Sequence, residues 1–358
     1  MFNKKSLVGL DLGARQIKAM QIDRTNAGWK VARTAHCITP KDAIKEGVVI
    51  DPEAVGIAIR QMLREHRISA TNAIIGVAGA SVIVRLVRIP KMPEATLRKS
   101  IKFEASRYVP SSIEDSFIEF EILGETPDGQ MDVLIVAAPR DVVETRLKAC
   151  EVAGLEVDCV DVEAFAMYRS LVEASEEGTA GGDVIALVDV GAQTTKVSVI
   201  NRGIFSMTRS ISQAGQTITD ALRTHFKLNE DEAELGKSQL DLRDLVGEAK
   251  AIESPPLRVI QPHVDDLIRE IRRSLNYYQS QHNDGGTPAP VTHLILSGGG
   301  ANLPGLAEYM QHKLDMPVVR AGVFDNPRFS LGHPEETGPG LDLAVVTGLA
   351  MRTHVKTA

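Results

Sequence analysis

The sequence is poor in cysteine and has no surplus of basic residues. Its three cysteines, Cys37, Cys150 and Cys159, fit no metal-binding spacing, and their odd number leaves at least one thiol unpaired, as expected of reduced thiols in the cytoplasm. Lys and Arg total 40 against 47 Asp and Glu, which gives a net charge of −7. This balance argues against binding to nucleic acid or to an anionic lipid surface.

Long apolar runs are also missing. No stretch approaches the roughly 20 apolar residues that a membrane-spanning helix needs. The short apolar run near the N-terminus is interrupted at Asp11, so a secretory signal is not expected. The 358 residues, 43% hydrophobic and 24% charged, have the length and composition of about two globular domains. The sequence therefore predicts a cytoplasmic protein without direct membrane insertion.

An internal repeat is the most informative feature. Residues 8–14 and 17–22 form two strand-like runs around a glycine-containing turn, and residues 186–192 and 195–200 repeat this pattern. The residues that recur at the same relative positions are Asp11 and Asp189, Gly13 and Gly191, Ala14 and Ala192, and Lys18 and Lys196. A third strand-like run follows each copy, at 29–38 and 203–211. Two similar β-meanders predict two similar lobes.

Between the two copies the pattern changes. Strands are predicted at 73–78, 83–88, 117–123 and 131–138, and helices at 94–108 and 141–153. After the second copy, helices are predicted at 214–226, 230–236 and 262–281, a loop at 284–290, a strand at 294–297, a helix from residue 303, an irregular segment at 322–340 and a last helix at 341–352. Glycine and serine at 175–182 mark the boundary between the lobes.

These elements predict a division of the chain. The first lobe is expected to comprise 1–72 with 159–178 and 341–358, and 73–158 to form a small α+β subdomain inserted into it. The second lobe is expected to comprise 183–213 with 291–340, and 214–290 to form a helical subdomain.

The duplicated Asp-x-Gly hairpins favour nucleotide chemistry. Their backbone N–H groups can bind phosphate oxygens, the glycine allows close approach, and the aspartate can hold Mg²⁺. A single copy is usually just a turn, but two copies that face each other would clamp a polyphosphate between the lobes. Lys18 and Lys196 are either solvated strand residues or phosphate contacts, and the sequence leaves both readings open.

A third glycine-rich element follows the strand at 294–297. The run from Ser297 to Gly305 contains Gly298, Gly299 and Gly300 and leads into a helix. Such a turn allows a ribose, base or phosphate to approach, or is simply a tight connection between a strand and a helix. Together with the two hairpins, it favours a nucleotide site.

These three segments resemble the phosphate-1, phosphate-2 and adenosine motifs of the actin, Hsp70 and sugar-kinase superfamily. Residues 162–166 and 344–350 are similar to its two connecting segments. The resemblance implies an α/β, actin-like two-lobed ATPase fold, made of duplicated ribonuclease H-like domains, with an inserted small α+β subdomain. It implies ATP and Mg²⁺ as cofactors.

The same resemblance implies site residues. Asp11 and Asp189 would be the metal ligands, and Glu163 the catalytic residue that orients water, in at most a slow ATPase. Alternatively, Glu163 is a helix N-terminal glutamate favoured by the helix dipole. The implied nucleotide-binding residues are Asp11, Gly13, Ala14, Arg15, Lys18, Asp189, Gly191, Ala192, Gln193, Thr194, Thr195, Lys196, Gly215 and Gln216 near the phosphates, Glu234 and Lys237 near the ribose and adenine, and Gly298, Gly299, Gly300 and Asn302 in the third motif.

Within this superfamily the insertion resembles that of the PilM family of type IV pilus assembly proteins. The similar segments are 89–93, 97–110, 136–144, 154–155 and 160–165, and the match runs nearly end to end. The division protein FtsA carries its distinctive subdomain at the same point. FtsA-like proteins usually end in an amphipathic membrane-binding helix, which we do not expect in this chain.

The family resemblance implies partners and a location. We expect ATP to fix the angle between the lobes, and the insertion to present a groove for the N-terminal cytoplasmic peptide of a PilN-like inner-membrane pilus protein. Phe103 and Tyr108 are expected either to line or support that groove or to belong to the core of an amphipathic helix. The resemblance also allows contacts with other pilus platform and motor proteins and a homo-oligomer. The chain would be cytoplasmic and recruited to the inner membrane through its partner.

Two alternative functions on the same fold stay open. One is a small-molecule phosphotransferase acting on a sugar or an acid, and the other is an FtsA-like, filament-forming division protein. One residue departs from the superfamily pattern, because Arg15 stands where actin-type hairpins commonly carry Ser or Thr. Its side chain either pairs with phosphate or points to solvent, and the sequence does not decide between them.

Overall fold

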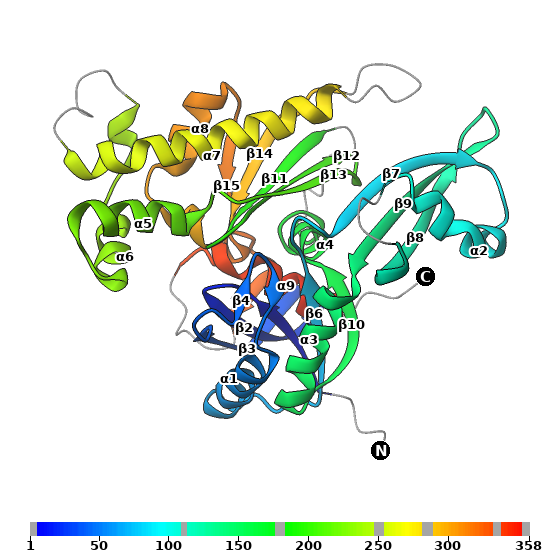
Figure 1. Ribbon diagram of the computed structural model, residues 1–358, viewed down its shortest axis with the longest axis horizontal. Coiled ribbons are helices and arrows are strands. Elements are labelled where there is room, and N and C mark those ends of the chain that lie inside the picture. Colours follow the sequence, from blue (N-terminus) through cyan, green and yellow to red (C-terminus); the bar gives the residue numbers. More distant parts are fainter. Residues whose placement is uncertain are drawn as a thin grey trace.

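The computed structural model describes residues 6–108, 113–175, 183–246, 254–280, 289–331 and 338–352. These residues form two sheet-based lobes, with a smaller sheet and its helix extending to one side (Figure 1). The boundary expected at 175–182 lies outside the described residues except for Ser175, and so does most of the loop expected at 284–290.

A mixed sheet forms the first lobe. Its strands, in sheet order, are β10 (Glu156–Val162), β6 (Asn72–Val77), β1 (Leu7–Leu12), β2 (Gln16–Thr25), β3 (Gly28–Ile38) and β16 (Phe329–Leu331). The meander β1-β2-β3 is antiparallel, while β6 runs parallel to β1 and β10 parallel to β6. Helices α1 (Pro52–Glu65) and α3 (Arg140–Ala153) pack on one face of this sheet. A short hairpin of β4 (Ile44–Lys45) and β5 (Val48–Val49) precedes α1.

The second lobe repeats this meander. Its strands, in sheet order, are β15 (Val318–Arg320), β14 (His293–Ser297), β11 (Val184–Val190), β12 (Thr195–Asn201) and β13 (Ile204–Ile211). Helices α5 (Gly215–Phe226), α7 (Pro255–Ser280) and α8 (Leu306–Leu314) pack on one face, and α6 (Glu230–Ser238) follows α5. Alternation along β11 sends Val184, Ala186 and Val188 to this core and Ile185 and Leu187 to the opposite one.

Two helices lie between the sheets and join the lobes. These are α4 (Glu163–Tyr168) and α9 (Ala344–Met351), at the positions of the two predicted connecting segments. Their apolar side chains share a core with Met20 of the first sheet and Leu187 of the second. The backbones of α4 and α9 approach closely where Gly348 faces Ala166, since a Cβ added at Gly348 would overlap the Ala166 carbonyl group. This contact requires a residue without a side chain.

The strand pairing bears on the limits of the inserted unit, which was expected at 73–158. Strands β7 (Ile83–Pro90), β9 (Gln130–Pro139) and β8 (Ser116–Glu125) form its sheet, which α2 (Glu94–Ala105) covers. Strand β7 pairs with β13, so this sheet continues that of the second lobe. Strand β6 and helix α3, which the expected range 73–158 includes, pack instead within the first lobe. The division stays a prediction, and the strand pairing favours 83–139 for the insertion.

Some elements differ from their predicted limits for local reasons. Helix α7 begins at Pro255 rather than at residue 262, with Pro262 inside it. The proline costs one backbone hydrogen bond, but Leu257, Ile260 and Val264 continue the buried stripe across it. The segment expected to be irregular at 322–340 includes β16, which pairs in parallel with β3. Among the described residues, no helix combines the length and the apolar character needed to cross a membrane.

The close contact between the connecting helices gives a stability prediction. Gly348→Ala should lower the free energy of unfolding by about 1–3 kcal/mol, because the added methyl group forces α9 away from α4. Urea denaturation of the purified variant measures this change. Gly236→Ala in α6 is the matched control, since no described atom would lie within 4 Å of its Cβ, and it should raise stability by up to about 1 kcal/mol. Equal effects of the two substitutions would contradict the contact.

Candidate functional site

A cavity of about 340 Å³ lies between the lobes. The turns after β1 and β11, the glycine turn after β14 and the starts of α4, α5 and α9 contribute to its wall. The structure brings together here every residue predicted from the sequence to bind nucleotide, with the exception of Thr195, and also Glu163. Thr195 is buried, and its hydroxyl group donates a hydrogen bond to the Gln213 carbonyl oxygen at 2.7 Å, so it supports the segment before α5.

The two hairpin turns have the same local geometry. The Gly13 N–H group donates to the Gln16 carbonyl oxygen at 3.2 Å, and the Gly191 N–H group donates to the Thr194 carbonyl oxygen at 3.0 Å. A Cβ at Gly13 or Gly191 would lie 2.7 Å from that same oxygen. Glycine is therefore needed for turns this tight. The sequence repeat is thus also a structural repeat at the cavity wall.

The glycine turn of the third motif packs against the second hairpin. Gly298 has φ of +93°, and a Cβ there would overlap the Asp189 carboxylate. A Cβ at Gly300 would overlap the Val190 side chain. At Gly299, by contrast, an added Cβ would approach only the Asp342 Cβ, at 3.8 Å, among the described atoms. The lack of a side chain at Gly298 and Gly300 therefore lets this turn pack against the second hairpin. Gly299 is not constrained by such a contact and faces free space at the cavity.

The constant spacing of Asp and Lys in the repeat has a structural cause. In the antiparallel register, Asp11 is directly opposite Lys18 and Asp189 is directly opposite Lys196. The Lys18 Nζ lies 3.8 Å from the Asp11 carboxylate, and the Lys196 Nζ lies 3.0 Å from that of Asp189. Opposite charges at such positions stabilise a hairpin. Neither lysine is a solvated strand residue, because both side chains are less than one-fifth exposed.

Glu163, at the start of α4, is held by the second of these lysines. Its carboxylate accepts a hydrogen bond from the Lys196 Nζ at 2.5 Å, and its side chain is 7% exposed. Burial favours a raised pKa for Glu163, but Lys196 and Arg146 outweigh it and hold the pKa below the usual value. Burial lowers the pKa of Lys196, and the carboxylates of Asp189 and Glu163 more than reverse this, so its pKa is raised. The buried pair is ionised at neutral pH.

The predicted Mg²⁺ ligands do not offer a free set of oxygen donors. Asp11 and Asp189 are each paired with a lysine, and Glu163 shares Lys196 with Asp189. No group of three or more His, Cys, Asp or Glu side chains suited to a metal ion occurs in the described part of the chain. Mg²⁺ prefers carboxylate and water oxygens in near-octahedral geometry, which an ammonium group between two carboxylates prevents.

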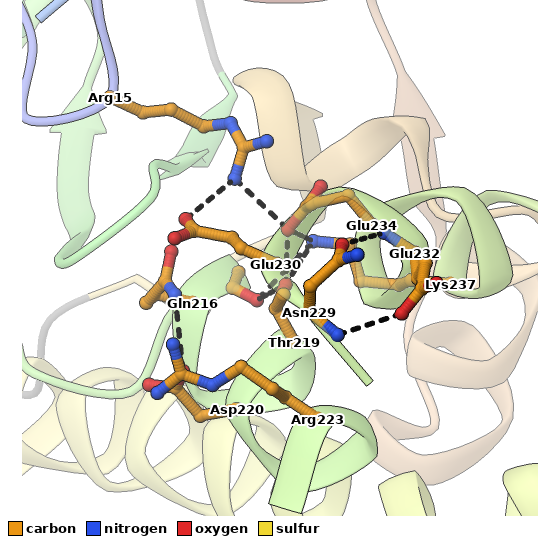
Figure 2. Close-up of polar contacts among 11 residues, drawn as sticks. Arg15, Gln216, Thr219, Asp220, Arg223, Asn229, Glu230, Glu232, Glu234 and Lys237 are labelled. Carbon is orange, nitrogen blue, oxygen red and sulfur yellow. Dashed lines mark hydrogen bonds and ion pairs between the residues drawn. The ribbon is translucent and has the colours of Figure 1, made fainter. Parts of the chain in front are cut away.

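Arg15 bridges the lobes, which is neither of the two roles left open by the sequence. It extends from the first hairpin to α6, where its guanidinium group lies 3.2 Å from Glu234 and 3.6 Å from Glu230 (Figure 2). Glu234 also contacts Lys237 at 2.7 Å and the Thr219 hydroxyl group. The predicted ribose and adenine residues therefore form a polar network that Arg15 ties to the opposite lobe.

The turn of the second hairpin also makes a contact with the opposite lobe. The Gln193 side-chain oxygen accepts a hydrogen bond at 3.1 Å from the backbone N–H group of Glu46, next to β5. Each hairpin turn thus touches the lobe that faces it. These two contacts join the lobes across the cavity in this structure.

Two charged residues of the cavity were not predicted from the sequence. Arg146 lies on α3, is 1% exposed and lowers the pKa of Glu163 from inside the first lobe. Its signal in the sequence is an arginine on an otherwise apolar helix face, with Val142, Ala149 and Cys150. Asp342, which precedes α9, lies 3.9 Å from the Lys18 Nζ, and nothing in its sequence context marks it.

A second cavity, of about 330 Å³, lies between the insertion and the lobes. Strands β7 and β13, the start of α4 and Tyr108 line it. Phe103 is not among the described residues of its wall. It is 65% exposed on α2, so it is not a core residue, and its part in a peptide groove stays a prediction. Lys196 lines both cavities.

The burial of Asp11 gives a prediction on pH. Burial, and secondarily the charge of Glu163, raise the pKa of Asp11 from 3.8 to about 6 in spite of Lys18. The pKa of Asp11 is higher in the folded than in the unfolded protein. The free energy of unfolding therefore falls as the pH rises from about 4 to 6, and this contribution of Asp11 is fully lost above pH 6. Asp11→Asn should therefore stabilise the protein by about 2 kcal/mol at pH 8. Denaturation curves should show this gain shrinking toward pH 4; a gain independent of pH would contradict the account.

Comparison with known proteins agrees with this geometry. The family model of the type IV pilus assembly protein PilM matches residues 9–354. The solved PilM-PilN type IV pilus biogenesis complex superposes with a TM-score of 0.82 at 25% identity, covering 98% of this chain and 99% of that chain. MreB 5 of Spiroplasma citri, bound to AMPPNP, has a TM-score of 0.53 at 12% identity, with 97% of this chain and 95% of that chain covered.

The curated relatives include the cell division protein FtsA of Streptococcus pneumoniae serotype 2, strain D39. It is 23% identical over 352 residues, which cover 87% of this chain and 74% of that protein. The predicted α/β, actin-like two-lobed fold is confirmed by these structural similarities. The family predicted from the insertion is also confirmed. This chain belongs to the PilM family of type IV pilus assembly proteins.

Proposed function

We propose that this chain is a scaffold of the type IV pilus assembly platform that binds ATP between its lobes. The observation that supports this most directly is the convergence of both Asp-x-Gly turns and the glycine turn on one cavity. Turns of this kind present backbone N–H groups to phosphate oxygens. Glu234 and Lys237, which also line the cavity, are proposed to contact the ribose and adenine.

The proposed function does not include Mg²⁺ at Asp11 and Asp189, because a lysine ammonium group already lies beside each carboxylate. Glu163 is likewise bonded to Lys196. A carboxylate engaged in this way is a poor acceptor for the proton of an attacking water. We therefore expect turnover to be very slow, so that the nucleotide acts as a structural ligand.

The second cavity is the proposed site for the partner. Its place beside Tyr108, at the junction of the insertion with the lobes, supports binding of the N-terminal cytoplasmic peptide of a PilN-like inner-membrane protein. Such a peptide would recruit the chain to the inner membrane. Contacts with other platform proteins and a homo-oligomer stay predictions. The family match over residues 9–354 favours pilus assembly over an FtsA-like filament or a phosphotransferase.

Nucleotide binding is tested by ligand-induced stabilisation. After removal of any co-purified nucleotide, ATP at about 100 times its Kd should raise the free energy of unfolding by about 2.7 kcal/mol. Gly299→Phe should abolish this increase without unfolding the protein, since a Cβ at this position would approach only the Asp342 Cβ among the described atoms and the position lines the cavity. Gly124→Phe, at an exposed position of β8 with no described atom within 4 Å of its Cβ, should respond to ATP as the unmodified protein does. An unmodified protein that ATP does not stabilise would contradict nucleotide binding.

Peptide binding is tested by fluorescence anisotropy with the labelled N-terminal cytoplasmic peptide of the PilN-like partner. Tyr108→Ala should weaken binding about tenfold, because an aromatic anchor is removed from the cavity. Phe103→Ala is the matched control on the same segment, and its exposed ring should contribute little. Equal losses in the two variants would place the peptide on α2 instead of in the cavity.

A further inference from the structure

The ammonium group of Lys196 fills the space between two buried carboxylates. Its Nζ lies 2.5 Å from Glu163 Oε2 and 3.0 Å from Asp189 Oδ2. The side chains of Glu163 and Asp189 are 7% and 12% exposed. Two carboxylates brought this close inside a protein need a cation between them, and in nucleotide sites that cation is often Mg²⁺. In this chain the ammonium group of Lys196 is that cation.

The position of Lys196 follows from the hairpin register and from α4. The register puts Lys196 opposite Asp189, and the start of α4 adds Glu163 on its other side. Lys18 has the same place in the first hairpin, but its contacts with Asp11 and Asp342 are longer, at 3.8 and 3.9 Å. The two lysines therefore have equivalent positions in the sequence repeat but differ in their contacts. Of the two, Lys196 forms short contacts to two carboxylates, and Lys18 does not.

The ionisable side chains of the cavity balance one another. Its acidic side chains are Asp11, Glu163, Asp189, Glu234 and Asp342, and its basic ones are Arg15, Lys18, Arg146, Lys196 and Lys237. Their formal charges cancel. Among the described contacts, Lys196 uses two of the three donors of its ammonium group, which leaves one N–H group for a ligand in the cavity.

We infer that Lys196 is a tethered cation in the place of Mg²⁺, so that this site binds nucleotide without a divalent metal ion. The inference rests on the proposed nucleotide binding. Lys196 holds the carboxylates of Asp189 and Glu163 apart, contributes a fixed positive charge to the cavity wall and keeps Glu163 from activating water. Removal of the Lys196 ammonium group frees both carboxylates and converts the cavity into a site that needs Mg²⁺.

The test compares ATP affinity in EDTA and in Mg²⁺. For the unmodified protein, the Kd from isothermal titration calorimetry should agree in the two buffers within about threefold. Lys196→Ala should bind at least about tenfold more weakly in EDTA, and Mg²⁺ should restore its affinity. Mn²⁺ titrated into the nucleotide-free proteins should bind Lys196→Ala and not the unmodified protein, as read from the loss of the free Mn²⁺ EPR signal.

A double variant and a control variant at Lys18 complete the experiment. If two unpaired buried carboxylates prevent Lys196→Ala from folding, Lys196→Ala with Glu163→Gln removes one of them and should still acquire Mg²⁺-dependent ATP binding. Lys18→Ala removes the equivalent lysine of the other hairpin. It should weaken ATP binding to the same extent in both buffers, because Lys18 makes no short bridge between carboxylates.

The outcomes separate this inference from the proposed function. Unmodified protein that binds ATP only with Mg²⁺ overturns the tethered cation and leaves nucleotide binding intact. Lys196 variants that bind ATP equally in EDTA and in Mg²⁺ also overturn it. Failure of every protein to bind ATP in either buffer overturns the inference together with the proposed nucleotide site.

Discussion

The structure depends on an ion pair that the antiparallel register creates twice. A spacing of Asp and Lys around a tight glycine turn places the two charges opposite each other at the end of each hairpin. Because both hairpins end at the same cavity, the lobes present matching charged turns to the space between them. In the second lobe, α4 adds Glu163 and turns the pair into a buried bridge. The chemistry of the cavity follows from this arrangement.

The same bridge connects the two cavities. Lys196 lines both, as do Ala78 and Gly79 in the segment after β6. The connecting helices α4 and α9 lie between the sheets and share one core with them, so a change in the lobe angle would move the walls of both cavities together. Nucleotide and peptide, if bound as proposed, would therefore meet the same small set of side chains, and each would bias the geometry that the other encounters.

Local sequence patterns were sufficient to predict the repeated elements of the fold. The hairpins and the glycine turn could be predicted because register and turn geometry act over a few residues, whereas the connecting segments followed from the resemblance to the superfamily. The ion pairs of Arg15 with α6 and the position of Arg146 behind Glu163 join segments far apart in the chain, and no local pattern encodes them. The pairing of β16 with β3 and the packing of α3 in the first lobe are non-local in the same way. The limits of the insertion, which stay a prediction, depend on such non-local pairing as well.

The most direct measurement is a crystal structure of the complex with ATP grown in the presence of Mn²⁺, with anomalous data collected at the manganese edge. The account predicts the phosphates between the turns at Gly13 and Gly191, with the Lys196 ammonium group between Asp189 and Glu163 and no anomalous peak there. A manganese peak between these carboxylates, with Lys196 displaced, would contradict it.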